Sequence, residues 1–167
     1  MMAKGRGIVT EYTIAPAGML LSLDMWDARG AMLGAIALPG PGRSHAAAGG
    51  TILRVGPKRW WLDGAGFDAV EATAALEGRG VVTPNAGGWR RVTLNGDWRD
   101  LVMQSGLFDA ETPAFGPGSV AMTTLCHAPC VLHVLGEDMC EVFVPASYAG
   151  HVLAHWQHCG WRRTDCG

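Results

Sequence analysis

The stretch from residue 115 to residue 161 limits the possible folds more than any other part of the chain. It holds three apolar segments typical of strands, at residues 120–125, 131–135 and 141–144, and then a helical segment at 146–159. Turn-forming residues separate the strands by only a few positions, which favours antiparallel neighbours. The stretch therefore predicts a three-stranded antiparallel unit followed by a helix.

The helix in this stretch should begin near Ser147, whose hydroxyl is a good N-cap group, and end at Gly160. Most of its apolar face should come from residues at helical spacing: Tyr148, Val152, Leu153 and Trp156. Trp161 should then start a short final strand.

The earlier part of the ordered chain repeats this element order. Residues 51–83 predict strand, turn, strand, helix and short strand, as residues 131–163 do. A further strand at 89–94 and a helix ended by Gly106 lie between them. Antiparallel strands with segregated helices define the α+β class. We expect two small half-domains, at about 51–95 and 96–167.

Residues 1–50 are expected to form an N-terminal tail and a Gly/Pro-rich loop. Residues 1–14 show no periodicity, and Pro39-Gly40-Pro41-Gly42 cannot hold a regular element. Residues 15–27 fit either a short helix or a strand.

The composition excludes several classes of function. A net charge of −2 and a pI of about 6.3 argue against nucleic-acid binding. No apolar run is long enough for a bilayer, and no secretory signal is recognisable. With five cysteines, an odd number, we expect a cytoplasmic protein with reduced thiols. Charged residues are only 17% of the chain, which fits either burial in a partner or a tightly packed monomer.

Specific segments resemble the gamma subunit of heterotetrameric sarcosine oxidase. The resemblance covers roughly residues 51–161. Its most specific parts are Phe115-Gly116-Pro117-Gly118, before a strand pair, and Val144-Pro145-Ala146-Ser147-Tyr148, between a strand and a helix that ends in a Trp. Residues 51–63 and 88–99 also resemble the opening strands of that family. The first third of the chain does not align, and the chain is richer in Cys and His than the family.

The resemblance implies a fold like the folate-binding domain of glycine-cleavage T-protein. It also implies alpha, beta and delta partner subunits in a flavoenzyme that oxidatively demethylates sarcosine or a related N-methyl amine. N-methylglutamate dehydrogenase has comparable subunits, so the amine stays open. FAD, FMN, NAD, tetrahydrofolate and zinc would belong to the partner subunits, and this chain would hold no cofactor and serve assembly.

The densest set of metal-ligand residues is Cys126, His127, Cys130 and His133. Zinc needs four converging ligands of this kind, but Cys is also among the most often buried residues, so packing in the turn and core is the competing interpretation. His151, His155 and His158 share one helix face and fit either a polar stripe or a metal pair.

No motif in the sequence indicates catalysis or nucleotide binding. The chain has no G-x-G-x-x-G, P-loop or G-x-S-x-G motif. We therefore expect no catalytic and no cofactor-binding residues, and interface contacts from a set of aromatic residues. Trp60 and Trp61 are adjacent strand residues and face opposite sides, so one should lie in the core and the other should be exposed or at an interface. The set is Trp60, Trp61, Phe115, Tyr148 and Trp156.

Two other functions stay open on the sequence alone. The chain could be a stand-alone folate or one-carbon binding protein of the T-protein superfamily, although it has only about half the expected length. It could also be a structural module organised by zinc at the Cys/His cluster.

Overall fold

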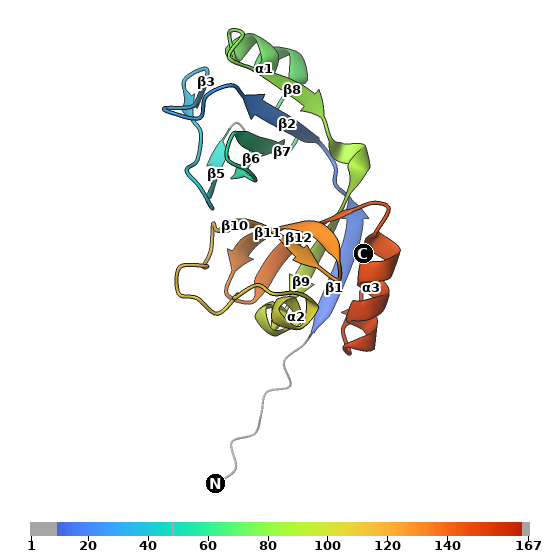
Figure 1. Ribbon diagram of the computed structural model, residues 1–167. Coiled ribbons are helices and arrows are strands. Elements are labelled where there is room, and N and C mark those ends of the chain that lie inside the picture. Colours follow the sequence, from blue (N-terminus) through green and yellow to red (C-terminus); the bar gives the residue numbers. More distant parts are fainter. Residues whose placement is uncertain (1–9, 48, 165–167) are drawn as a thin grey trace.

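The computed structural model describes residues 10–47 and 49–164 and shows two lobes stacked one above the other (Figure 1). Each lobe is built on a mainly antiparallel sheet. We call the lobe that holds β2 to β8 the first lobe and the lobe that holds β1 and β9 to β13 the second lobe. The chain begins in the second lobe with one strand, crosses to the first lobe, and returns to the second through residues 86–88.

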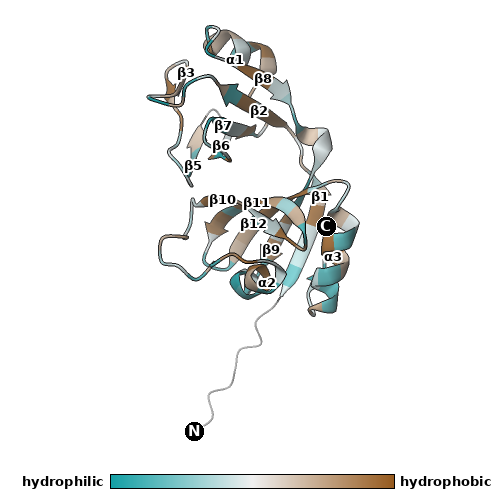
Figure 2. Ribbon diagram, in the orientation of Figure 1, coloured by the Kyte–Doolittle hydropathy of each residue, from teal (hydrophilic) through white to brown (hydrophobic). Residues whose placement is uncertain are grey.

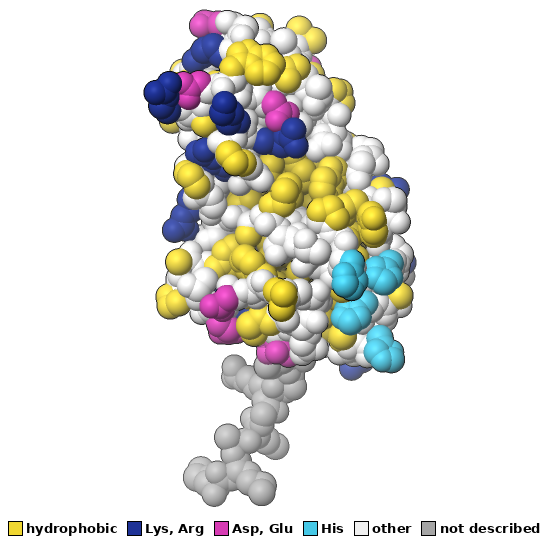
Figure 3. Space-filling view, viewed as in Figure 1, with side chains coloured by type: hydrophobic (Ala, Val, Ile, Leu, Met, Phe, Trp, Pro, Cys, Tyr) yellow, Lys and Arg dark blue, Asp and Glu magenta, His cyan; other side chains and the backbone are white. Residues whose placement is uncertain are grey.

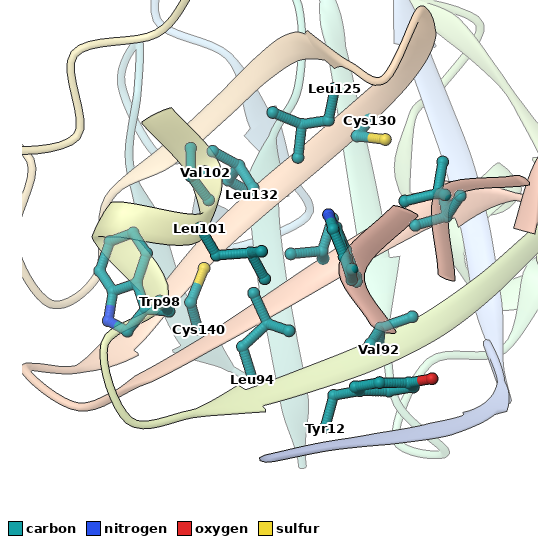
Figure 4. Close-up of a cluster of buried hydrophobic side chains, with 14 of the residues drawn as sticks. Tyr12, Val92, Leu94, Trp98, Leu101, Val102, Leu125, Cys130, Leu132 and Cys140 are labelled. Carbon is teal, nitrogen blue, oxygen red and sulfur yellow. The ribbon is translucent and has the colours of Figure 1, made fainter. Parts of the chain in front are cut away.

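The second lobe contains a six-stranded sheet in the order β10-β11-β12-β9-β1-β13. Its strands are β1 (Glu11–Pro16), β9 (Trp89–Asn95), β10 (Val120–Leu125), β11 (Ala128–Gly136), β12 (Met139–Pro145) and β13 (Arg162–Arg163). The helices α2 (Trp98–Ser105) and α3 (Ala149–His158) cover one face. Figure 4 shows the core beneath them, where Trp98 and Leu101 meet Leu94 and Cys140.

The first lobe contains a five-stranded sheet in the order β5-β6-β7-β2-β8. Its strands are β2 (Leu20–Met25), β5 (Ser44–Ala47), β6 (Gly50–Arg54), β7 (Arg59–Asp63) and β8 (Gly80–Pro84). One face packs under α1 (Ala69–Ala75) and the small hairpin of β3 (Met32–Leu33) and β4 (Ile36–Ala37). Brown, apolar segments in Figure 2 run along the strands of both sheets.

A third apolar cluster joins the two lobes. It combines residues of the first sheet, such as Leu53 and Trp61, with Val131 and Phe143 of the second. The Trp61 ring lies edge-on to Phe143, with 5.4 Å between ring centroids, and Trp61 is 2% exposed. The inter-lobe surface is therefore a packed core, which favours one rigid arrangement of the lobes.

The helix α1 shows how local chemistry sets an element. The Asp68 side chain accepts hydrogen bonds from the N–H groups of Val70 and Glu71, so the helix begins after it. Phe67, before the cap, and Ala72, four residues after it, are buried in the same cluster, as in a hydrophobic staple. Val70 points outward and is 77% exposed.

The start of α3 differs from the prediction. The N-cap is Tyr148 rather than Ser147, and no side chain caps the helix. A turn in which the Tyr148 N–H donates to the Pro145 carbonyl precedes the helix and delays its first turn. Tyr148 is therefore 45% exposed instead of lying on the apolar face, while Val152 and Trp156 are buried as expected.

The prediction of a tail and loop over residues 1–50 is wrong for the part that the structure describes. Residues 10–47 contribute β1 to β5, and the part of the prediction covering residues 1–9 lies outside the described residues. β1 pairs with β9 on one side and β13 on the other, and β2 lies between β7 and β8. Both are interior strands, stabilised by partners far away in the sequence.

The strand partners also place the boundary between the halves before residue 95. β9 pairs with β12 and β1, so residues 89–95 belong to the second lobe rather than to the first half-domain. The α+β class of antiparallel strands and helices is confirmed. None of the helices within residues 10–47 and 49–164 has the length and apolar character needed to cross a membrane.

Candidate functional site

A chain of five polar side chains runs along the junction of the two lobes. Asp63 and Ser44 come from the first sheet, and Arg91, Glu141 and His133 come from the second. All five lie beside the apolar cluster that joins the lobes. The residues are linked in the order Asp63, Arg91, Glu141, His133, Ser44 by direct contacts.

Arg91 is the centre of this inter-lobe network. Its guanidinium Nη2 donates to the Asp63 carboxylate and, over 2.9 Å, to the Ala17 carbonyl. Its Nη1 donates to Glu141 Oε1 over 2.9 Å. The guanidinium carbon also lies 4.9 Å from the centre of the Phe143 ring. One side chain thus binds a carboxylate from each lobe.

His133 extends the network from Glu141 to the first lobe. Its Nδ1 lies 3.3 Å from Glu141 Oε2, and its Nε2 lies 3.0 Å from Ser44 Oγ. Ser44 Oγ is also 3.1 Å from the Gly118 carbonyl, which already accepts the Ser44 N–H. The hydroxyl can therefore donate to the ring or to the carbonyl, according to which His133 nitrogen carries a proton.

The pKa values of the two carboxyls are shifted in opposite directions. Burial raises the pKa of Asp63, and this effect exceeds the lowering caused by the Arg91 hydrogen bond and charge. Burial would also raise the pKa of Glu141, but hydrogen bonds from His133 and Arg91, with their charges, hold it below its ordinary value. Burial opposes the charge on Arg91, but its two carboxylate partners raise its pKa, so the guanidinium stays charged.

These shifts predict opposite pH dependences for two variants. A lowered pKa makes Glu141 stabilising above its ordinary value of 4.5, and this contribution is lost as pH falls through the folded-state pKa. A raised pKa makes the Asp63 contribution largest below 3.8 and lost as pH rises through the folded-state pKa. Asp63→Asn should thus steepen the rise of stability with pH, and Glu141→Gln should flatten or reverse it.

Urea unfolding of both variants and the unchanged chain between pH 3 and pH 7 checks this. The comparison uses the slope with pH, because each variant also loses hydrogen bonds at every pH. Parallel curves for the three proteins would show that neither carboxylate titrates differently in the folded state.

The order Ser44, His133, Glu141 is that of nucleophile, base and acid in serine hydrolases. Acyl transfer also needs free N–H donors for the oxyanion. Here the Ser44 N–H donates to Gly118, the Gly118 N–H to Val134, and the Ser119 N–H to Gly116. Arg91 further holds Glu141 as one arm of an ion-pair network. We therefore assign the network to holding the lobes together rather than to covalent chemistry.

The structure does not bring the four candidate zinc ligands together. Cys130 and His133 lie on β11 at an odd spacing, so Cys130 enters the helix-covered core while His133 faces the other lobe. Cys126 and His127 form the tight turn before β11, both with positive φ. Within the described residues no three His, Cys, Asp or Glu side chains gather as a metal site.

The cysteines behave mainly as core and turn residues. Burial raises the pKa of Cys130 to about 12, so at neutral pH it is a protonated thiol and a poor metal ligand. On α3, His151 and His158 are exposed, and the His155 ring lies 3.6 Å from Cys159 Sγ. Figure 3 shows histidines gathered at the surface of this part of the second lobe.

Four of the five aromatic interface candidates are buried inside the chain. Trp60 packs under α1, Trp61 packs between the lobes, and Phe115 and Trp156 lie in the second core. Trp60 and Trp61 do face opposite sides of the first sheet. However, α1 covers one side and the second lobe covers the other, so neither tryptophan is exposed. Tyr148 alone of the five presents a large exposed area, 45%.

Sequence reasoning missed the network itself and the most exposed tryptophan. Trp26, directly after β2, is 63% exposed although its indole Nε1 donates to the Gly78 carbonyl over 3.0 Å. The available signal for the network was a charged residue within or at the end of a mainly apolar strand, as at Asp63 and Glu141.

Comparison with known proteins identifies the fold. No family model matches the chain, and no curated protein matches it. Among solved structures, it is similar to a chain of the heterotetrameric sarcosine oxidase from Corynebacterium sp. U-96 in complex with pyrrole 2-carboxylate, with a TM-score of 0.74 at 22% identity. The match covers 88% of this chain and 80% of that chain, so the two have similar lengths.

The architecture is thus that of a two-lobed α+β chain with a solved counterpart. That counterpart is a chain of a heterotetrameric oxidase. A match over 88% of the chain is longer than the stretch of residues 51–161 that the sequence resemblance covered.

Proposed function

We propose that this chain is a non-catalytic, gamma-type accessory subunit of a heterotetrameric flavoenzyme. The complex would oxidatively demethylate sarcosine or a related N-methyl amine, and this chain would support assembly with the large FAD- and folate-binding subunit. The observation that carries the proposal is the match over 88% of the chain to a similarly sized chain of a heterotetrameric sarcosine oxidase.

The chemistry of the described residues supports a structural role. The Ser-His-Glu series lies within an ion-pair network, and the backbone N–H groups near Ser44 already donate to carbonyls. Among the described residues, no three possible metal ligands gather as a site. In this proposal FAD, FMN, NAD, tetrahydrofolate and zinc are held by the alpha, beta and delta subunits. This chain contributes surface rather than reacting groups.

The proposal predicts that the chain co-purifies with its partners. The tagged full-length chain, co-expressed with the alpha, beta and delta subunits, should elute with them as one species on gel filtration. That species should oxidise an N-methyl amine, while the chain alone should oxidise none. Omitting this chain should lower the yield of the assembled complex.

Two results would contradict the proposal. One is a complete, active complex of alpha, beta and delta that forms equally well without this chain. The other is saturable binding of tetrahydrofolate by the isolated chain, read by tryptophan fluorescence, which would favour a stand-alone one-carbon binding protein. Metal analysis of the same sample tests the zinc module.

A further inference from the structure

The end of α3 carries a histidine and a cysteine in contact at the surface of the second lobe. His155 Nε2 lies 3.6 Å from Cys159 Sγ, and the Cys159 N–H donates to the His155 carbonyl over 3.0 Å. This helical bond sets the two side chains, four residues apart, next to each other on one face. Cys159 is exposed and His155 is half-buried, so a ligand from solution can reach the pair.

The separation of the two atoms fits a shared metal ion. Zinc binds imidazole nitrogen at about 2.0–2.1 Å and thiolate sulfur at about 2.3 Å, with tetrahedral angles between its ligands, which places the nitrogen and the sulfur about 3.6 Å apart. His155 Nε2 and Cys159 Sγ already have this separation. Zinc binding would therefore need no change in the spacing of these two atoms, only the loss of the thiol proton.

Two further histidines lie close to the pair in the same helix. His151 is one turn before His155, and His158 directly precedes Cys159. Both are exposed, so their side chains can change rotamer rapidly, and histidines four residues apart on a helix can bind one metal ion. Figure 3 shows histidines gathered on this surface. Since no three possible ligands already gather among the described residues, the pair would be the fixed part of the site.

The position at the end of the helix also favours a cation. Cys159 is the C-cap of α3, and Gly160, with φ +91°, ends the helix directly after it. The last carbonyls of a helix carry partial negative charge, which stabilises a positive ion nearby. No Lys or Arg occurs within α3, and the next cations in the sequence, Arg162 and Arg163, lie beyond the cap on β13.

We propose that His155 and Cys159 bind a zinc ion at the surface of the second lobe. One of the two exposed histidines and water would fill the remaining positions. The thiol gives its proton to solvent, and its sulfur and the imidazole nitrogen each donate an electron pair to the ion. The proposal does not rest on the accessory role, and the zinc of a partner subunit would be a separate ion. A hydrogen bond between thiol and imidazole is the competing explanation of the contact.

The test is zinc binding by the full chain, measured by equilibrium dialysis after treatment with a chelator. A phosphine reductant keeps Cys159 reduced. We expect one zinc ion per chain at this site. Loss of a group that only orients a metal ligand already lowers affinity about 10- to 100-fold, so His155→Ala and Cys159→Ser should each lower it at least about tenfold.

Two variants serve as controls for the loss of a thiol and of an imidazole. Cys126→Ser removes a half-buried thiol in the turn before β11, and His45→Ala removes a half-buried histidine on β5 of the first lobe. Both should bind zinc as the unchanged chain does. Circular dichroism should be the same for all four variants and after chelation, because the site lies outside the two cores. A zinc-organised module would instead lose its fold with the ion.

A second measurement reports the sulfur ligand directly. Cobalt(II) can replace zinc at sites with nitrogen and sulfur ligands, and a thiolate bound to cobalt absorbs in the near ultraviolet by charge transfer. This absorption should appear when cobalt is added to the unchanged chain and should be absent for Cys159→Ser.

Three results would overturn the proposal. If the unchanged chain binds no zinc, the contact between His155 and Cys159 is a hydrogen bond only. If either His155→Ala or Cys159→Ser binds zinc with full affinity, the ion is held elsewhere. If cobalt binds without the sulfur absorption, Cys159 is not a ligand. None of these results bears on the accessory role, which association with the partner subunits tests.

Discussion

Arg91→Met is expected to lower the free energy of unfolding by about 3 kcal/mol, since removing one partner of a buried ion pair leaves the other charge without compensation. Two carboxylates would be affected, Asp63 with 8% and Glu141 with 12% of its side chain exposed. For a chain of this length, such a loss lowers the melting temperature by roughly 6–12 °C. Urea unfolding at pH 7 measures it directly.

The neighbouring arginine provides the control. Arg90 is half-buried and its Nη1 donates to the Trp89 carbonyl over 3.2 Å, so Arg90→Met should cost about 1 kcal/mol or less. Equal losses for the two variants would show that the ion pairs of Arg91 add nothing to stability.

A triple variant separates the attraction within the Arg91 ion pairs from the free-energy cost of removing their charges from water. When Arg91, Asp63 and Glu141 are all replaced by apolar residues of similar volume, no charge remains to be buried, and most of the stability lost in Arg91→Met should return. The two lobes would then be held by the apolar cluster alone. A triple variant less stable than Arg91→Met would mean that the hydrogen bonds themselves are required.

The elements that the sequence predicted well are those with a clear local period. The strands β6 and β10 to β12 and the helix α2 lie where alternation and helical spacing placed them, and Gly106 and Gly160 end α2 and α3 as expected. In each case apolar residues recur on one face and a turn residue stops the pattern. Such signals need no knowledge of distant partners.

The first two strands could not be predicted because they are stabilised by pairing with strands far away in the sequence. β1 reads Glu-Tyr-Thr-Ile-Ala-Pro, with a charge at one end and a proline at the other, and residues 15–27 fitted a helix as well as a strand. Pairing of β1 with β9 and of β2 with β7 buries Tyr12 and Leu23 completely. Tertiary pairing thus decides the conformation where local propensity does not.

The inter-lobe network has no local signature for the same reason. Its residues lie on five different strands, from Ser44 to Glu141, and no two of them share a motif. The Cys/His cluster, by contrast, is dense in the sequence but is divided by the alternation of β11. Once the structure places Cys130 and His133 on β11, their odd spacing puts them on opposite faces of the sheet. The residues that do meet could be found only from the sheet order.

Trp61→Ala is expected to lower the free energy of unfolding by about 3–5 kcal/mol, because it empties the centre of the apolar cluster between the lobes. The indole makes edge contacts to Phe143, at 5.4 Å between ring centroids, and to Trp89, at 4.7 Å. Trp26→Ala is the control, since that ring is 63% exposed and should cost about 1 kcal/mol or less.

The shape of the Trp61→Ala unfolding curve tests how the lobes are coupled. The chain crosses between them twice, at residues 17–19 and 86–88, and the apolar cluster and Arg91 both span the junction. We therefore expect one cooperative transition at lower denaturant, with far-ultraviolet circular dichroism and tryptophan fluorescence changing together. Two separated transitions would show that each lobe is stable alone. The inter-lobe core would then orient the lobes without determining whether they fold.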